Sequence, residues 1–138
     1  MTSSLRRPLD RRECMERLAG AGVGRVVVAA GDLAEVFPVN FVVHRGRIIF
    51  RTDPGTKLIW SPAADVAFEV DTMGADGRGW VVVAHGPAGE IDSFDGPVRP
   101  EGLRSLGVDP WAGGERVHWI SIEPVRVDGN EVSARLGP

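Results

Sequence analysis

Hydrophobic and polar positions alternate along most of the chain, and one early stretch has a helical pattern instead. Within residues 10–20, Cys14 and Leu18 lie four positions apart, which places them on one face of a helix. Asp10 followed three residues later by Glu13 is typical of a capping box at a helix start. The pattern predicts a helix over 10–20 whose apolar face, Cys14 included, packs on a core.

After this helix the pattern changes to short runs of β type, most of them bounded by Gly, Pro or Asp. The predicted strands cover residues 25–30, 38–44, 47–52, 65–72, 79–91, 117–123 and 125–132. Several strands at short spacing with few helices predict a mainly β fold, an antiparallel sheet closed into a small barrel.

Two interruptions do not have a strand pattern. Residues 54–64 are expected to hold a short helix, and residues 95–114 form a Pro- and Gly-rich loop with room for a helical turn over 100–106. A loop of this length often carries function.

The composition is that of one globular domain. A chain of 138 residues with 43% hydrophobic and 25% charged residues suits a single core, so we expect one domain over 1–138 with residues 1–8 as a flexible tail. No apolar run approaches the roughly 20 residues that span a bilayer, and no apolar segment of a secretory signal follows the N-terminal arginines. These features predict a soluble, cytoplasmic protein without a membrane partner. The net charge of -3 argues against a nucleic-acid partner.

The segment 50–58 joins an apolar strand to a predicted helix start and is rich in anion-binding groups. Arg51 and Lys57 supply positive charges, and Thr52 and Thr56 supply hydroxyls. Because side chains alternate along a strand, Arg51 and Thr52 point to opposite faces, so one reaches a ligand directly and the other from the rim or from a partner subunit. The segment predicts a phosphate-binding site, and a solvated turn is the alternative.

Other chemistry is not marked by local motifs. His44, His85 and His118 are scattered without the spacing of metal ligands, so no metal site is predicted. No nucleophile, base and orienting group stand at recognisable spacing, and no carboxylate pair suggests hydrolysis. Catalytic residues are therefore unknown, and the chemistry is expected to come from a cofactor.

The order of these segments resembles the pyridoxamine 5'-phosphate oxidase-like family, the flavin-binding split β-barrel proteins. The branch it is similar to is the short bacterial one that includes nitroimidazole-resistance-type reductases. The resemblance runs from about residue 13 to 132 and rests on residues 38–43, 50–58, 66–71 and 79–86 in this order. It implies a split antiparallel β-barrel of Greek-key type, with a few short helices, that holds flavin mononucleotide (FMN) at the interface of a homodimer.

The resemblance also implies which residues bind the cofactor. Thr52, Thr56 and Lys57 correspond to phosphate contacts, with Arg51 beside them. The strand with Asn40 would lie along the flavin ring, where the amide either bonds the ring edge or faces the surface. The residues implied on these strands, turns and loops are Val39, Asn40, Phe41, Phe50, Arg51, Thr52, Thr56, Lys57, Trp80, Val81 and Trp111.

Val81 departs from the family pattern, and Trp111 has two alternative roles. Trp80 and Val81 open a strand that faces the cofactor in the family, and many relatives have Ser where this chain has Val81, which removes one ring hydrogen bond. Trp111, in the long loop, either reaches the cofactor or plugs the barrel end.

Three functions remain open from the sequence. The first is an FMN-dependent oxidoreductase acting on an unknown small organic acceptor, nitro-aromatic or quinone-like. The second is a reductase of the same fold using the deazaflavin F420, whose longer tail would be held by Arg45, Arg47 and Arg51. The third is a non-catalytic flavin-binding or sensing dimer. Oxidation of vitamin B6 is disfavoured, because the chain has no tyrosine and lacks the longer terminal regions of the true oxidases.

Overall fold

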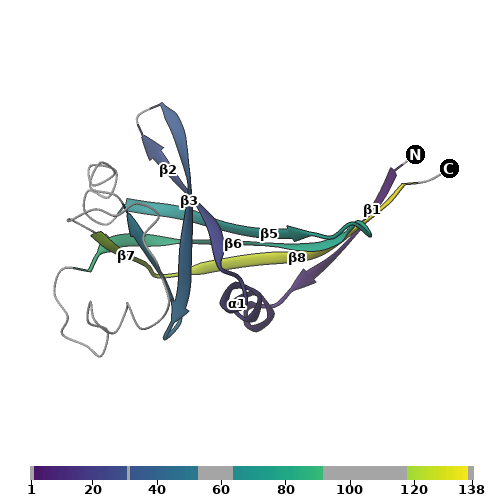
Figure 1. Ribbon diagram of the computed structural model, residues 1–138, viewed down its shortest axis with the longest axis horizontal. Helices are drawn as coiled ribbons and strands as arrows, with labels where there is room; N and C mark the ends of the chain where they lie inside the picture. The colour runs from purple at the N-terminus through teal and green to yellow at the C-terminus, as the bar shows by residue number, and fades with distance from the viewer. Residues whose placement is uncertain (1, 31, 53–63, 92–117, 137–138) are drawn as a thin grey trace.

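The computed structural model describes residues 2–30, 32–52, 64–91 and 118–136 (Figure 1). The helix expected within 54–64 and the loop expected over 95–114 lie outside these residues. The described elements are β1 (Thr2–Leu9), α1 (Arg11–Ala19), β2 (Val23–Ala30), β3 (Leu33–His44), β4 (Arg47–Thr52), β5 (Ala64–Met73), β6 (Arg78–Glu90), β7 (His118–Ile122) and β8 (Arg126–Leu136). The seven predicted strands correspond to β2 to β8, and β4 has the predicted bounds.

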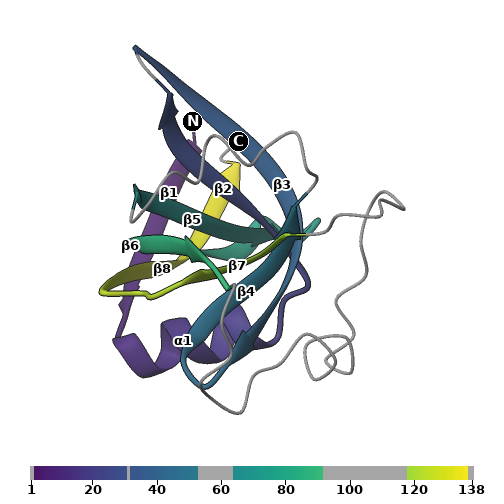
Figure 2. The same cartoon turned by 90° about the vertical axis from the view of Figure 1, so that its left-hand side faces the viewer.

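The strands form one antiparallel sheet that closes on itself. Their order is β1-β8-β6-β5-β2-β3-β4-β7, and β7 also pairs with β6. This last pairing joins β6, β5, β2, β3, β4 and β7 into a barrel, with α1 below it in the view of Figure 2. The predicted mainly β fold, an antiparallel barrel, is confirmed.

The barrel is split because the long strand β6 has two successive partners on one edge. Its residues 78–85 pair with β8, and residues 88–90 pair with β7. Strands β8 and β1 therefore continue away from the barrel as an arm, at whose end both termini lie (Figure 1).

Gly86 lies on β6 at the change of partner. On either side of it, Val125 N donates to His85 O at 2.9 Å and Glu123 N donates to Pro87 O at 3.1 Å. A Cβ at Gly86 would lie 1.7 Å from the Glu123 carbonyl oxygen. Only glycine allows the connection between β7 and β8 to approach β6 this closely.

The barrel interior is filled by aromatic and aliphatic side chains. The rings of Phe41 and Phe68 meet edge to face with centroids 4.8 Å apart, and Phe50 stacks on Phe68 at 6.5 Å. Ile48 and Phe50 belong to this core, whereas Ile49 packs in a separate cluster with Trp119. The alternation predicted for the strand over 47–52 is therefore confirmed.

Helix α1 begins with the predicted capping box. The Asp10 side chain accepts from Glu13 N at 2.8 Å, and the Glu13 side chain accepts from Asp10 N at 3.3 Å. Cys14 and Leu18 are fully buried in the core, so the packing role predicted for this face is confirmed. The described part of the chain contains no helix that is long and apolar enough to cross a membrane.

The prediction of a flexible tail over residues 1–8 is wrong for 2–8. These residues belong to β1, which pairs with β8 from Thr2 opposite Leu136 to Leu9 opposite Gly129. Strand β1 lies at the edge of the sheet, and Leu9 is its only buried side chain among residues 5–9. The backbone ladder orders the strand, and no hydrophobic alternation marks it in the sequence.

Candidate functional site

The outer face of β3, β4 and β7 carries the first group of expected site residues. Phe41 pairs with Phe50 across β3 and β4, and Arg51 pairs with Trp119 across β4 and β7. Phe41 and Phe50 enter the core, so Asn40 and Arg51, one position along each strand, face outward at the same end of the pair. The structure therefore brings Asn40 and Arg51 together.

Three other expected site residues turn their side chains into the barrel. Val39, Phe41 and Phe50 are 7%, 3% and 0% exposed and belong to the core. A ligand on the outer face can meet these residues only through their backbone.

Arg51 is held against an aromatic ring. Its guanidinium carbon lies 4.8 Å from the centroid of the Trp119 ring, within the range of a cation–π contact. Trp119 and Ile49 are buried on this outer face and pack with the partly buried Val42 and Ile91. An apolar surface with a fixed cation at its edge can hold a planar ligand that carries an anionic group.

Trp119 was not found from the sequence. No motif marks it, and its relation to Arg51 depends on the pairing of β4 with β7, two strands far apart in the chain. The one available signal was its outward position in the predicted strand over 117–123, one residue after a histidine.

The remaining residues of the predicted phosphate-binding segment are only partly described. The backbone of Thr52 ends β4 opposite His118. Thr56, Lys57 and Trp111 lie outside the described residues, and their contacts with a cofactor stay predictions.

Trp80 and Val81 lie far from Arg51 within one chain. Phe50, next to Arg51, pairs with Ile120, and Ile120 pairs with Glu90 at the end of β6. Trp80 stands ten residues earlier on the same strand, so roughly 30 Å of strand separates the two groups. Figure 1 shows β7 and the β1–β8 arm at opposite ends of the long axis. One chain therefore does not bring Trp80 and Arg51 to the same ligand.

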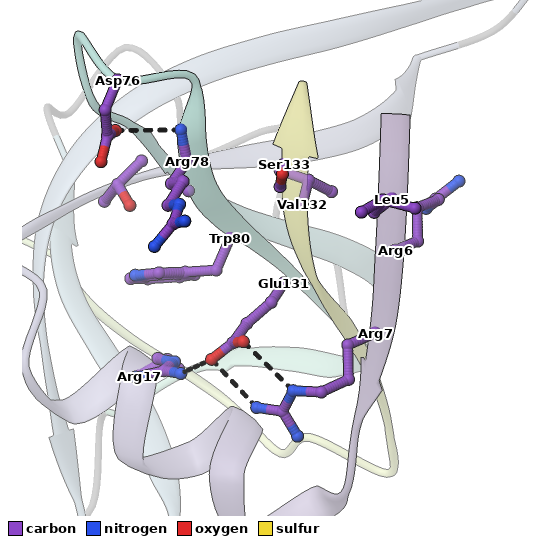
Figure 3. Close-up of a pocket in the computed structure, with 12 residues that line it drawn as sticks. Leu5, Arg6, Arg7, Arg17, Asp76, Arg78, Trp80, Glu131, Val132 and Ser133 are labelled. Carbon is purple, nitrogen blue, oxygen red and sulfur yellow. Dashed lines mark hydrogen bonds and ion pairs between the residues drawn. The ribbon is translucent and has the colours of Figure 1, made fainter. Parts of the chain in front are cut away.

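Within this chain, Trp80 lines a cavity of about 700 Å³ between β1, β8, the β5–β6 hairpin and the last turn of α1 (Figure 3). Besides the indole of Trp80, the cavity wall is strongly charged. Its charged residues are Arg6, Arg7, Arg17, Asp76, Arg78 and Glu131.

Glu131 is the centre of an ion-pair network at this wall. Arg7 donates to it through Nη2 at 2.9 Å and Nε at 3.1 Å, and Arg17 Nη2 donates to the same carboxylate. The hydrogen bonds from Arg7 first, and then the charges of Arg7 and Arg17, hold the pKa of Glu131 below its ordinary value. Arg7 also pairs with Glu13 at 3.0 Å, so the network ties β1 to both α1 and β8.

No metal or thiol chemistry is indicated in the described residues. No group of three or more His, Cys, Asp or Glu side chains in them could hold a metal ion. Burial raises the pKa of the Cys14 thiol, and nearby carboxylates raise it further. Cys14 is therefore kept as a neutral thiol in the core and does not have the thiolate character of a nucleophile.

Comparison with known proteins identifies the family of this fold. The family model described as pyridoxamine 5'-phosphate oxidase matches residues 10–136. The uncharacterized protein Rv0080 of Mycobacterium tuberculosis is 35% identical over 133 residues, which cover 91% of this chain and 85% of the relative.

Solved structures agree with this match. A Corynebacterium glutamicum protein named after pyridoxamine 5'-phosphate oxidase has a TM-score of 0.80 and 34% identity, covering 94% of this chain and 99% of the other. The FAD binding protein of Mycobacterium smegmatis has a TM-score of 0.75 and 28% identity, covering 91% and 98%.

The predicted likeness to the nitroimidazole-resistance branch is confirmed at the level of the fold. A Bacteroides thetaiotaomicron protein named for resistance to 5-nitroimidazole antibiotics has a TM-score of 0.66 and 12% identity, covering 99% of this chain and 93% of the other.

Proposed function

Because the chain belongs to the pyridoxamine 5'-phosphate oxidase family, we propose that it is a flavin-binding oxidoreductase that acts on a small organic acceptor. The observation that carries the proposal is the outer-face surface where Arg51 stacks on Trp119 beside Asn40. The naming of the Mycobacterium smegmatis relative as an FAD binding protein supports a flavin as the ligand. We propose FMN as the form, because the predicted phosphate-binding segment over 50–58 suits a terminal phosphate.

The residues of this surface have separate tasks in the proposal. Arg51, fixed on Trp119, binds the anionic group of the cofactor, and Asn40 bonds the edge of its ring. The cluster around Ile49 and Val42 excludes water from one ring face. A bound flavin supplies the hydride-transfer chemistry, and these side chains hold and orient it.

In this proposal the site is shared between two copies of the chain. Val81 lies on the outer face of β6, because Val82 and Ala84 point into the core and side chains alternate. Val81 is also roughly 30 Å of strand from the surface at Arg51, so a flavin bound there meets Val81 only from a partner copy. A homodimer with two shared sites, related by the two-fold symmetry common in soluble oligomers, satisfies this condition.

An F420-dependent reductase is the second candidate. Arg47 and Arg51 belong to the same strand and point to the same side of it, about 13 Å apart. The long anionic tail of F420 would bridge this distance, whereas FMN would not.

Titration of the purified protein with FMN, FAD and F420 tests the cofactor. We expect saturable FMN binding that Arg51→Gln weakens about tenfold. Arg126→Gln is the matched control, because Arg126 is an exposed strand arginine that pairs with Asp128 away from this surface. Loss of F420 binding in Arg47→Gln would support the second candidate.

Reduction of the bound flavin tests the activity. We expect reduced nicotinamide to bleach the flavin absorbance without oxygen and a nitro-aromatic or quinone acceptor to restore it. A bound flavin that no donor reduces would leave a non-catalytic flavin-binding or sensing dimer as the function.

A further inference from the structure

The cavity at Trp80 is built on one face of the arm. Thr72, Trp80, Glu131 and Arg7 form a row of directly paired residues across β5, β6, β8 and β1. Paired residues in an antiparallel sheet point to the same side, so these four side chains share one face. Figure 3 shows Arg17 approaching the row from α1 and Arg78 pointing toward the indole from the other side.

The charges of this cavity favour an anion. Arg7, Arg17 and Arg78 lie on this face with Glu131 and Asp76, whereas Arg6, next to Arg7 on β1, points to the other side of the strand. Glu131 is already committed to Arg7 and Arg17, and Asp76 accepts from the backbone N of Arg78 at 3.0 Å. The carboxylates are thus engaged, and the guanidinium of Arg78 remains to attract an anionic ligand.

Two arginines have N–H donors that no described residue accepts from. Within the described part of the chain, the Arg78 guanidinium makes no ion pair and no hydrogen bond, and the buried Arg17 Nε–H has no acceptor. An unsatisfied buried donor destabilises the folded protein, so an anionic oxygen bound at Arg17 Nε would relieve that cost.

The indole of Trp80 adds a planar apolar wall. It is partly buried against the core and also faces the cavity between Arg78 and the Glu131 network (Figure 3). An indole face of this kind stacks on flat rings. The volume of about 700 Å³ lies within the usual range of small-molecule sites.

This cavity is separate from the flavin surface of the proposed function. Trp80 lies on the same face of β6 as Val82 and Ala84, which point into the core. Val81, the residue expected to meet a flavin from the partner, points to the opposite face. The sheet itself therefore stands between the two ligands.

We propose that the cavity beside Trp80 is a second ligand site, for a small molecule that combines a planar ring with a carboxylate or a phosphate. Trp80 stacks on the ring, and Arg78 and Arg17 bind the anionic group. The site does not need a bound flavin.

Calorimetric titration with paired probes tests the ligand class. The anionic probes are adenosine monophosphate and 4-nitrobenzoate, and their neutral counterparts are adenosine and 4-nitrobenzamide. We expect at least one anionic probe to bind about tenfold more tightly than its neutral counterpart and than inorganic phosphate. The tighter anionic probe identifies phosphate or carboxylate as the natural group. Equal affinity within both pairs, or no binding of either anionic probe, overturns the proposal.

Variants locate the binding in this cavity. Arg78→Gln is expected to weaken the anionic probe about tenfold, while Arg12→Gln, an exposed arginine of α1 paired with Glu16 at 3.1 Å, leaves it unchanged. Trp80→Leu is expected to remove the preference for a ring over inorganic phosphate. If Trp80→Leu does not fold, Arg78→Gln decides the question, because the Arg78 guanidinium makes no hydrogen bond or ion pair among the described residues.

A parallel titration with FMN separates this site from the proposed function. Arg78→Gln is expected to bind FMN as the natural chain does, and a loss of FMN affinity in step with the probe overturns the second site. Probe binding by a protein that binds no flavin would support the cavity and defeat the proposed function.

Discussion

Arg51 and Trp119 pair across β4 and β7, and the guanidinium carbon lies 4.8 Å from the centroid of the indole. Trp119 is only 6% exposed although it belongs to the outer face of the barrel. The contact fixes a cation at the end of β4, where the predicted phosphate-binding segment begins.

This contact should be visible as energetic coupling in ligand binding. We expect Arg51→Gln and Trp119→Leu each to weaken FMN binding about tenfold, because one removes the charge and the other releases it from its position. The double variant should lose less than the product of the two effects, since the residues act together. Flavin titration of the four proteins measures the coupling, and independent effects would mean that Trp119 does not position Arg51.

Gly86 should be indispensable to the split of the barrel. A Cβ there would lie 1.7 Å from a backbone oxygen of Glu123, and the backbone cannot withdraw without breaking the pairing of β6 with β7 or β8. We expect Gly86→Ala to lower the free energy of unfolding by about 3 kcal/mol or to prevent folding.

Gly89 on the same strand is the matched control for Gly86. A Cβ at Gly89 would meet nothing within 4 Å, so Gly89→Ala should change the free energy of unfolding by less than about 0.5 kcal/mol. Denaturant unfolding of both variants compares them, and equal effects would contradict the close approach at Gly86.

The Glu131 network should make the arm sensitive to acid. The pKa of Glu131 is lowered in the folded protein, chiefly by its hydrogen bonds with Arg7, so ionised Glu131 stabilises the fold above its unfolded pKa of about 4.5. This stability is lost as the pH falls through the lower, folded pKa. We expect Glu131→Gln to have a lower Tm than the natural chain at pH 7 and the two Tm values to converge below pH 4.5.

Glu16→Gln controls for the loss of one surface carboxylate in this measurement. Glu16 forms an exposed i,i+4 pair with Arg12, so its replacement should leave Tm nearly unchanged across the same pH range. A Tm difference for Glu131→Gln that does not depend on pH would assign the effect to packing.

Val81 should limit the affinity for a flavin. A serine at this position would add a hydroxyl on the outer face of β6 that can bond the flavin ring. We expect Val81→Ser to tighten FMN binding about two- to tenfold. Val83→Ser, on the same face two residues along, should have no effect. Unchanged FMN affinity in Val81→Ser would mean that Val81 does not contact the flavin.

The features that were predictable from the sequence are those that depend on near neighbours. The capping box of α1 needs only Asp10 and Glu13, and the bounds and alternation of β4 follow from residues 47–52. Strand β1 was missed because an edge strand with few buried side chains has no apolar pattern, and its order comes from β8.

The residues of the candidate site also fall into those visible from the local sequence and those that depend on distant strands. Arg51 and Asn40 were identified, because a charge and an amide at strand positions are visible in the sequence. Trp119 and the cavity at Trp80 were not, because each depends on pairings between distant strands. The exchange of partners along β6, which sets Trp80 apart from Arg51, is likewise a property of the whole sheet.

Complementation between two defective chains tests whether the flavin site is shared. Arg51→Gln removes the anion contact from one side of each site, and Val81→Arg places a bulky charge on the other side. In a mixed dimer of the two variants, one site receives both defects and the other receives an intact Arg51 from one chain and an intact Val81 from its partner. We expect each variant alone to bind FMN weakly and the mixture, after subunit exchange, to recover natural affinity at up to one site per mixed dimer. Mixing the chains without recovery of binding, although the mixed dimer forms, would mean that Arg51 and Val81 do not serve the same ligand.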